Sequence, residues 1–158
     1  MPKLSAALLV YRDRGTREVL LVHPGGPFWA RKDDGAWSIP KGEYVEPEEP
    51  LAAAYREFGE EVGITPPTST PRDLGTSRLS SGKIVTCFAV EGDVDLTDFS
   101  SNMFEMEWPR GSGRVQAFPE CDRAGWFSLA DARVKLGQGQ LPFLDRLGPD
   151  EGVQSLEQ

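Results

Sequence analysis

Residues 42–64 read GEYVEPEEPLAAAYREFGEEVGI, and this stretch decides the fold. Its second half predicts an amphipathic helix, because bulky apolar residues recur at helical spacing at positions 51, 55, 58 and 62. Glu57, Glu60 and Glu61 lie three and four residues apart, so at about 100° per residue they fall within an arc of about 100°. The helix therefore carries an apolar face and, roughly opposite to it, a face of carboxylates.

This carboxylate face is unfavourable for the helix itself. Like charges four residues apart repel one another, and acids in the last turns oppose the helix dipole. Gly63 is the natural residue to end the helix, which places Glu60 and Glu61 in those last turns. An ordinary solvated acidic face is the alternative interpretation. We favour a site for a divalent cation, Mg²⁺ or Mn²⁺, because hard cations prefer oxygen ligands.

The same stretch resembles the Nudix box, G-x5-E-x7-R-E-U-x-E-E-x-G-U, in which U is a bulky aliphatic or aromatic residue. Every fixed position of the box is matched, by Gly42, Glu48, Arg56, Glu57, Phe58, Glu60, Glu61, Gly63 and Ile64. Constraints at this many fixed spacings make the signal specific. The resemblance implies an α+β fold, namely an α/β/α sandwich with a mixed β-sheet in which the box forms a loop–helix–loop. It also implies a pyrophosphohydrolase that acts on phosphoanhydride bonds.

Composition favours one soluble cytoplasmic domain. A chain of 158 residues can bury one substantial core; we expect a single Nudix hydrolase domain over residues 1–148 and a polar tail over 149–158. The chain lacks a run of about 18 apolar residues that would span a membrane, and its apolar start reads as a strand rather than a signal peptide. Cys87 and Cys121 lack metal or redox spacing, which favours buried thiols.

The net charge of −8 disfavours polymeric nucleic acid and membranes as partners. A small nucleotide remains compatible, because a bound cation screens phosphate from carboxylate. We expect a monomer or a homodimer.

Alternating apolar residues predict strands over residues 4–11 and 18–23, joined by a turn at 13–15. Further strands are expected over residues 36–39, 74–79, 83–91, 103–108 and 125–127. Pro50 suits the first turn of the box helix. Ser128 is expected to cap a short helix, and a last helix begins near Pro142. Strands on both sides of one helix, followed by late helices, again indicate an α+β sandwich.

Hydrolysis of a diphosphate needs a nucleophilic water and neutralised phosphate charge, and a carboxylate-bound cation supplies both. We assign Glu57, Glu60 and Glu61 as metal ligands, with Glu57 and Glu60 also catalytic. Arg56 is expected either to orient Glu60 or to pin the helix to the preceding loop. Glu120 is the candidate auxiliary base, because in Nudix proteins similar to the diadenosine tetraphosphate hydrolases an acid at this offset before a tryptophan reaches the metals.

Substrate contacts are expected just before the box. Residues 37–42 read WSIPKG and resemble the W-x-x-P-K-G approach of Nudix enzymes that cleave dinucleoside polyphosphates or diphosphoinositol polyphosphates. Lys41 is then a phosphate contact, with a solvated lysine as the alternative. Lys83 begins a strand that we expect to face the pocket. Four aromatic residues are candidates to stack a base, although the last two suit a core equally: Phe28, Trp29, Trp37 and Trp108.

Two classes of function follow from these residues. The first is a metal-dependent hydrolase, whose leading substrate is a dinucleoside polyphosphate and whose second candidate is an oxidised nucleoside triphosphate. Sequence markers of ADP-ribose, NADH and coenzyme A hydrolases are absent, and so is a tyrosine found in some dinucleoside polyphosphate hydrolases. The second class is a Nudix domain kept as a ligand sensor without turnover. Loss of box acids would favour the sensor, and because every box acid is present we favour the hydrolase.

Overall fold

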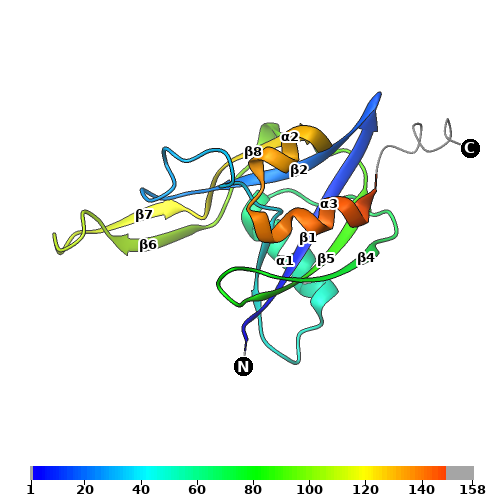
Figure 1. The fold of residues 1–158 in the computed structure, drawn as a ribbon. Helices are drawn as coiled ribbons and strands as arrows, with labels where there is room; N and C mark the ends of the chain where they lie inside the picture. Colours follow the sequence, from blue (N-terminus) through cyan, green and yellow to red (C-terminus); the bar gives the residue numbers. More distant parts are fainter. Residues whose placement is uncertain (1, 149–158) are drawn as a thin grey trace, which may run out of the picture.

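The computed structural model describes residues 2–148, and the expected tail at 149–158 lies outside the described residues. A mixed six-stranded sheet forms the centre, in the order β4-β5-β1-β2-β8, with β3 also paired to β1 (Figure 1). Its strands are β1 (Leu4–Arg14), β2 (Thr16–Pro24), β3 (Lys41–Tyr44), β4 (Arg72–Arg78), β5 (Ile84–Glu91) and β8 (Cys121–Ser128). A separate hairpin of β6 (Met103–Glu107) and β7 (Val115–Pro119) projects from this body.

Strand β1 organises the sheet. It runs parallel to β5 along its length and antiparallel to both β2 and β3. Strand β3 pairs with Leu4–Ala7, whereas β2 pairs with the distal residues Tyr11–Arg14. Strands β2 and β3 therefore lie along the same edge of β1, one after the other. Between their pairings, the Leu8 N–H of β1 donates to the carbonyl of Pro40, just before β3, at 3.1 Å. Residues 37–40 are therefore held against β1 and are mostly buried, and Lys41 begins the paired strand.

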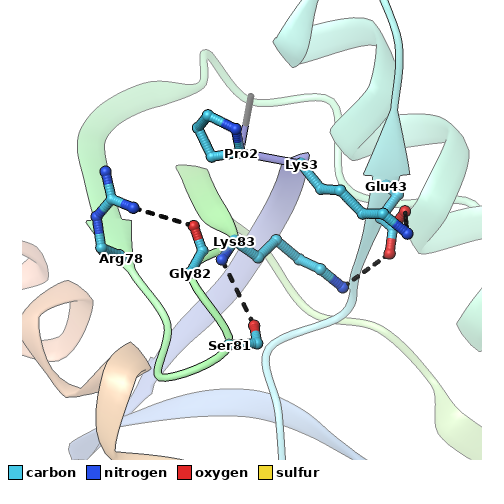
Figure 2. A pocket seen from close by; sticks show the side chains of 7 residues that line it. All are labelled: Pro2, Lys3, Glu43, Arg78, Ser81, Gly82 and Lys83. Carbon is cyan, nitrogen blue, oxygen red and sulfur yellow. Dashed lines mark hydrogen bonds and ion pairs between the residues drawn. The ribbon is translucent and has the colours of Figure 1, made fainter.

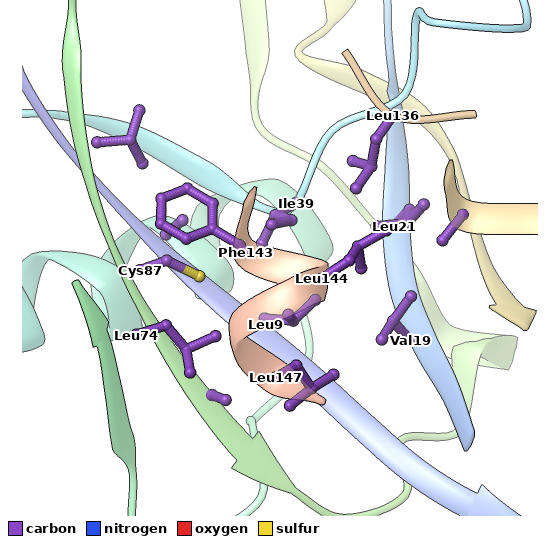
Figure 3. Packing of buried hydrophobic residues seen from close by; sticks show 14 of the residues in the cluster. Leu9, Val19, Leu21, Ile39, Leu74, Cys87, Leu136, Phe143, Leu144 and Leu147 are labelled. Carbon is purple, nitrogen blue, oxygen red and sulfur yellow. The ribbon is translucent and has the colours of Figure 1, made fainter. Parts of the chain in front are cut away.

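Helices cover both faces, as the predicted α/β/α sandwich requires. Along β1, Ala7 and Leu9 face one core, and the alternate residues Ala6, Leu8 and Val10 face the other, as the two-residue period of a strand dictates. The first core is closed by α2 (Leu129–Lys135) and α3 (Leu141–Leu147); Figure 3 shows α3 lying over the strands, with Phe143, Leu144 and Leu147 turned toward them. The second core is closed by α1 (Pro50–Val62).

The box helix α1 has the limits that its sequence predicts. Pro50 stands in its first turn, where the missing N–H is harmless. Gly63 ends it in the left-handed conformation, at φ 73°, and donates its N–H to the carbonyl of Gly59 at 2.8 Å. Its buried residues are Ala53, Ala54, Glu57, Phe58 and Val62. One carboxylate of the acidic face is thus buried together with the apolar residues.

Two predicted elements need correction, and one observed strand was not expected. Residues 36–39 form no regular strand: Ser38 and Trp37 make only isolated bridges, to Val22 and Leu136, and the regular strand begins at Lys41. Residues 125–127 are the end of a longer strand, β8. Strand β7 was not expected, because its Val-Gln-Ala-Phe-Pro sequence is largely exposed and carries little apolar alternation.

Other predictions hold. The hairpin of β4 and β5 is present, and the Ser128 side chain caps α2 by accepting the N–H of Asp131 at 3.1 Å. Cys87 and Cys121 are both buried free thiols. Within residues 2–148, the structure contains no helix with the length and apolar character needed to cross a membrane.

Candidate active site

The acids of the box helix face β3 at close range. Glu61 Oε1 accepts the backbone N–H of Lys41 at 3.0 Å. Glu57 is only 8 % exposed, and its carboxylate lies directly against Gly42. A Cβ added to Gly42 would come within 1.9 Å of Glu57 Oε2. The box glycine therefore leaves room for the buried Glu57 carboxylate, which a larger residue would displace.

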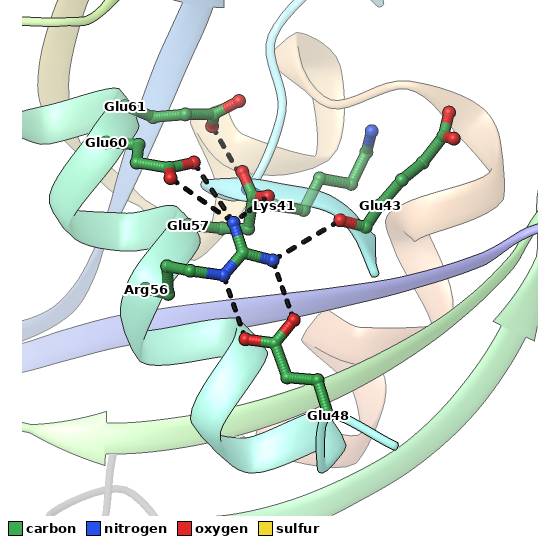
Figure 4. A network of polar contacts seen from close by, with 7 residues as sticks. All are labelled: Lys41, Glu43, Glu48, Arg56, Glu57, Glu60 and Glu61. Atoms are coloured by element: carbon green, nitrogen blue, oxygen red, sulfur yellow. Dashed lines mark hydrogen bonds and ion pairs between the residues drawn. The ribbon is translucent and has the colours of Figure 1, made fainter. Parts of the chain in front are cut away.

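Arg56 connects this face of the helix to the preceding loop, as Figure 4 shows. Its Nε and Nη2 donate to the two carboxylate oxygens of Glu48 at 2.8 and 2.9 Å, which is a bidentate pair. Its Nη1 donates to Glu57 at 2.8 Å and to Glu60 at 3.2 Å. Nη2 also reaches the backbone carbonyl of Glu43 at 3.4 Å. Both expected contacts of Arg56 are present, since it pins the loop and touches two acids at once.

Glu120 comes from a distant part of the sequence and joins the same site. Its backbone N–H donates to the carbonyl of Asn102 at 2.7 Å, and the Asn102 N–H donates to the carbonyl of Glu60 at 2.8 Å. The carbonyl of Glu120 is held as well, because it accepts the Gly25 N–H at 2.9 Å. These backbone bonds fix Glu120 beside the end of α1.

The four carboxylates influence one another. Burial raises the pKa of Glu57 and Glu120, and raises the pKa of Glu61 to about 7. Negative neighbours act in the same direction: Glu120 raises the pKa of Glu57 and Glu61, and Glu60 raises the pKa of Glu120. Concentrated negative charge of this kind is costly unless a cation compensates it.

The donor set fits a hard divalent cation. All four groups present carboxylate oxygens, which Mg²⁺ and Mn²⁺ prefer, and no soft ligand is needed. Among residues 2–148, however, no three acidic, histidine or cysteine side chains already converge on one point. Arg56 Nη1 lies between Glu57 and Glu60 and holds both. Binding a cation through both acids would therefore require a side-chain rearrangement in which Arg56 keeps its bidentate hold on Glu48.

The candidate substrate contacts divide into two groups. Lys41 and Trp37 both line a cavity of about 420 Å³. None of the four acids lines it, and the Lys41 N–H that binds Glu61 is its connection to them. Trp37 is 7 % exposed, donates its Nε1–H to Asp33 at 2.7 Å and packs edge-on against Phe127. Most of its ring therefore belongs to the core, and only an edge reaches the cavity. Burial lowers the pKa of Lys41, while Glu61 opposes that shift.

Lys83 lies in a neighbouring hollow rather than in this cavity, and its Nζ is 2.9 Å from Glu43 Oε2. Of the other aromatic candidates, Trp29 lines the cavity and is 40 % exposed. Phe28 is 51 % exposed and stacks edge-on with Trp108, with ring centroids 5.4 Å apart. This second pair does not line the cavity.

Sequence reasoning missed the far wall of the cavity. Residues 79–81, at the turn between β4 and β5, and residues 137–140, before α3, line it together, and Gly139 packs directly against Leu79. Gln140 is 6 % exposed and accepts the Ile39 N–H at 2.9 Å, which ties this wall to the segment that carries Trp37. No local pattern marks these residues, because folding alone brings them beside the box.

The chain is similar to known proteins in sequence and in fold. The family profile described as NUDIX domain matches residues 1–147. A relative named RNA pyrophosphohydrolase, from Photobacterium profundum, is 27 % identical over 128 residues, which cover 77 % of this chain and 59 % of that protein. The chain thus spans about three fifths of the length of this curated relative.

Solved structures show the same fold. The NUDIX domain of Shewanella oneidensis NrtR, complexed with ADP ribose, superposes with a TM-score of 0.63 at 18 % identity, covering 93 % of this chain and 86 % of that one. A C. elegans Ap4A hydrolase binary complex superposes with a TM-score of 0.59 at 22 % identity, covering 96 % and 98 %. With a family profile matched along nearly the whole chain and a complete box, this protein belongs to the Nudix family.

Proposed function

We propose that the protein is a metal-dependent pyrophosphohydrolase that cleaves a phosphoanhydride bond in a nucleoside diphosphate derivative. The observation that carries this proposal is the set of four mutually interacting carboxylates, Glu57, Glu60, Glu61 and Glu120. The Lys41 N–H binds one of them, Glu61, and Lys41 lines a cavity of about 420 Å³. A sensor without turnover has no need for an additional, half-buried acid beside the box carboxylates.

Glu57, Glu60 and Glu61 would hold Mg²⁺ or Mn²⁺. Such an ion supplies neutralisation of phosphate charge and activation of water. Glu120 is the proposed base: it accepts a proton from water as the water oxygen bonds to phosphorus and the bridging P–O bond breaks. Its raised pKa favours that role, because a stronger base accepts the proton more readily. The leaving phosphate departs with the bridging oxygen.

Two residues position these groups. Arg56 acts through Glu57 and Glu60 and is a positioning residue. Lys41 is the proposed phosphate contact, since its side chain lines the cavity and its backbone N–H holds Glu61. Its half-buried ammonium would gain a compensating charge from a bound phosphate.

The leading substrate is a dinucleoside polyphosphate. The cavity is lined by both apolar and polar groups, including the exposed ring of Trp29, which suits one nucleoside, with Lys41 toward the phosphates. A second candidate is the 5′-polyphosphate end of an RNA, which the name of the bacterial relative favours. That outcome would contradict our expectation that polymeric nucleic acid is not a partner.

A substrate panel tests the proposal. Diadenosine tetraphosphate, 8-oxo-dGTP, ADP-ribose and 5′-triphosphorylated RNA are incubated with the protein and Mg²⁺ or Mn²⁺, and the products are resolved by chromatography. We expect the highest kcat/KM with diadenosine tetraphosphate. Absence of any cleavage, with retained nucleotide binding, would instead identify a ligand sensor.

A further inference from the structure

A second hollow, of about 620 Å³, lies beside the candidate active site (Figure 2). Its walls come from the start of the chain, from β3 and from the hairpin of β4 and β5. It is lined by Pro2, Lys3, Glu43, Arg78, Ser81, Gly82 and Lys83. No residue of the proposed hydrolytic centre lines it.

The lining is unusually basic for this chain. Lys3, Arg78 and Lys83 contribute three positive charges, against one negative charge from Glu43, whereas the chain as a whole carries −8. The Glu43 carboxylate lies 2.9 Å from the Lys83 ammonium and 3.7 Å from that of Lys3. The hydrogen bond with Lys83 is the main cause that lowers the pKa of Glu43, so this acid is ionised. No acid among residues 2–148 pairs with Arg78. The hollow therefore keeps a local excess of positive charge.

The hairpin turn positions these groups. Gly82 has φ 90°, a left-handed conformation that favours glycine, and its N–H donates to the Leu79 carbonyl at 2.8 Å. Arg78 Nη1 donates to the Gly82 carbonyl at 3.3 Å, which holds the guanidinium over the turn while leaving its other donors available. Two of the three basic groups, Arg78 and Lys83, are thus presented by the hairpin of β4 and β5, and Lys3 comes from the start of the chain.

The hollow continues toward the active site. Ser81 lines both the hollow and the cavity that holds Lys41. A polyphosphate chain that contacts Lys41 at one end can therefore extend past Ser81 to Lys83 and Arg78. It would remain in a region of positive potential along this path.

We propose that this hollow is a subsite for the phosphate groups of a polyphosphate chain beyond the linkage that is cleaved. That the hollow binds phosphate groups is inferred from its charges. That these phosphates belong to the substrate rests on the proposed function. Oxygen atoms of a polyphosphate accept from guanidinium and ammonium donors, and Arg78 offers the planar fork that suits them. Glu43 is the internal counter-charge that an entering anion must overcome.

Binding of inorganic tripolyphosphate in metal-free buffer tests the subsite without requiring turnover. Isothermal titration calorimetry compares the parent with Lys3→Ala/Arg78→Gln, and with Arg133→Ala as the matched control. Arg133 is an exposed arginine on α2 whose ion pair with Asp145 lies outside both hollows. We expect the dissociation constant to rise about tenfold in the double variant and to stay at the parental value in the control, as two exposed charge contacts are lost.

Glu43→Gln gives an opposing test. Removing the counter-charge should tighten tripolyphosphate binding about threefold, an effect that a purely structural role of the hollow would not produce. Both effects should weaken with added salt, because these side chains are accessible to solvent. Thermal melts of each variant establish that it is folded.

Equal affinity in the parent and the double variant would overturn the proposal, as would an equal loss in Arg133→Ala or weaker binding in Glu43→Gln. These outcomes are separate from those of the substrate panel. A protein that cleaves no nucleotide but loses tripolyphosphate binding in the double variant would retain the subsite and refute the proposed hydrolysis. A protein that hydrolyses nucleotides, but whose double variant binds tripolyphosphate as tightly as the parent, would support the proposed hydrolysis and refute the subsite.

Discussion

Replacing Gly42 by alanine adds one methyl group at the contact between β3 and the box helix. In the structure that methyl carbon would lie 1.9 Å from Glu57 Oε2 and 2.0 Å from its Cδ. Ordinary contact requires about 3.4 Å, so the carboxylate must move by about 1.5 Å. Glu57 has little room to do so, because it is 8 % exposed and held by Arg56 at 2.8 Å.

The magnitude follows from that displacement. Overpacking of a tight site costs about 1–3 kcal/mol in the free energy of unfolding. Misplacing a catalytic group by about 1 Å costs on the order of 100-fold in rate. We therefore expect Gly42→Ala to fold, to melt several degrees lower than the parent and to lose about 100-fold in kcat.

Gly59→Ala is the matched control, because it makes the same change within the same box. Gly59 lies inside α1, and a Cβ added there would meet no atom within 4 Å. Alanine in a helix interior is more stable than glycine by about 0.5–1 kcal/mol. The control should therefore melt slightly higher than the parent and keep its kcat.

The assay combines thermal unfolding with initial rates at saturating nucleotide and Mg²⁺. Opposite shifts in melting temperature, with loss of turnover in Gly42→Ala alone, are the expected result. Parental turnover in a folded Gly42→Ala protein would refute the placement of Glu57 in the catalytic machinery. A loss of turnover in both variants would show that the box tolerates no methyl group, and would remove the steric explanation.

Three further results are expected. Glu60→Gln should lower turnover by orders of magnitude while leaving the melting temperature in chelator unchanged or slightly raised, because it relieves repulsion on the helix; full activity of the parent in chelator would contradict the metal assignment. Glu120→Gln should lower kcat strongly with little change in KM and should remove the acidic limb of the pH–rate profile, which steady-state kinetics measures. Burial raises the pKa of Glu61 in the folded protein from 4.5 to about 7, so its contribution to the stability of the metal-free protein is present below pH 4.5 and lost as the pH rises through about 7. Denaturant titrations across this pH range should show that the free energy of unfolding falls by an amount on the order of 2 kcal/mol, after allowance for solvent screening. The Glu61→Gln variant should not show this fall.

The sequence alone determined the box helix and its neighbourhood. Helical spacing of its apolar residues, Pro50 at one end and Gly63 at the other are local signals, and each reappears in α1 with the predicted limits. Strands β1, β2, β4 and β5 were also predictable, because alternation of apolar residues reports burial on a sheet face. The segment before Lys41 was misassigned, since its bridges to Val22 and Leu136 depend on partners far along the chain.

Only the tertiary structure decided how the site is assembled. The sequence suggested Glu120 through resemblance, but its approach to α1 depends on backbone bonds through Asn102 that no local pattern encodes. The burial of Glu57 against Gly42 likewise needs β3 and α1 to pack together. The basic hollow unites Lys3, Glu43 and the 78–83 hairpin, which are distant in sequence and individually ordinary. Spacing along one helix fixes which side chains share a face, whereas contacts between elements depend on how the sheet brings separate segments together.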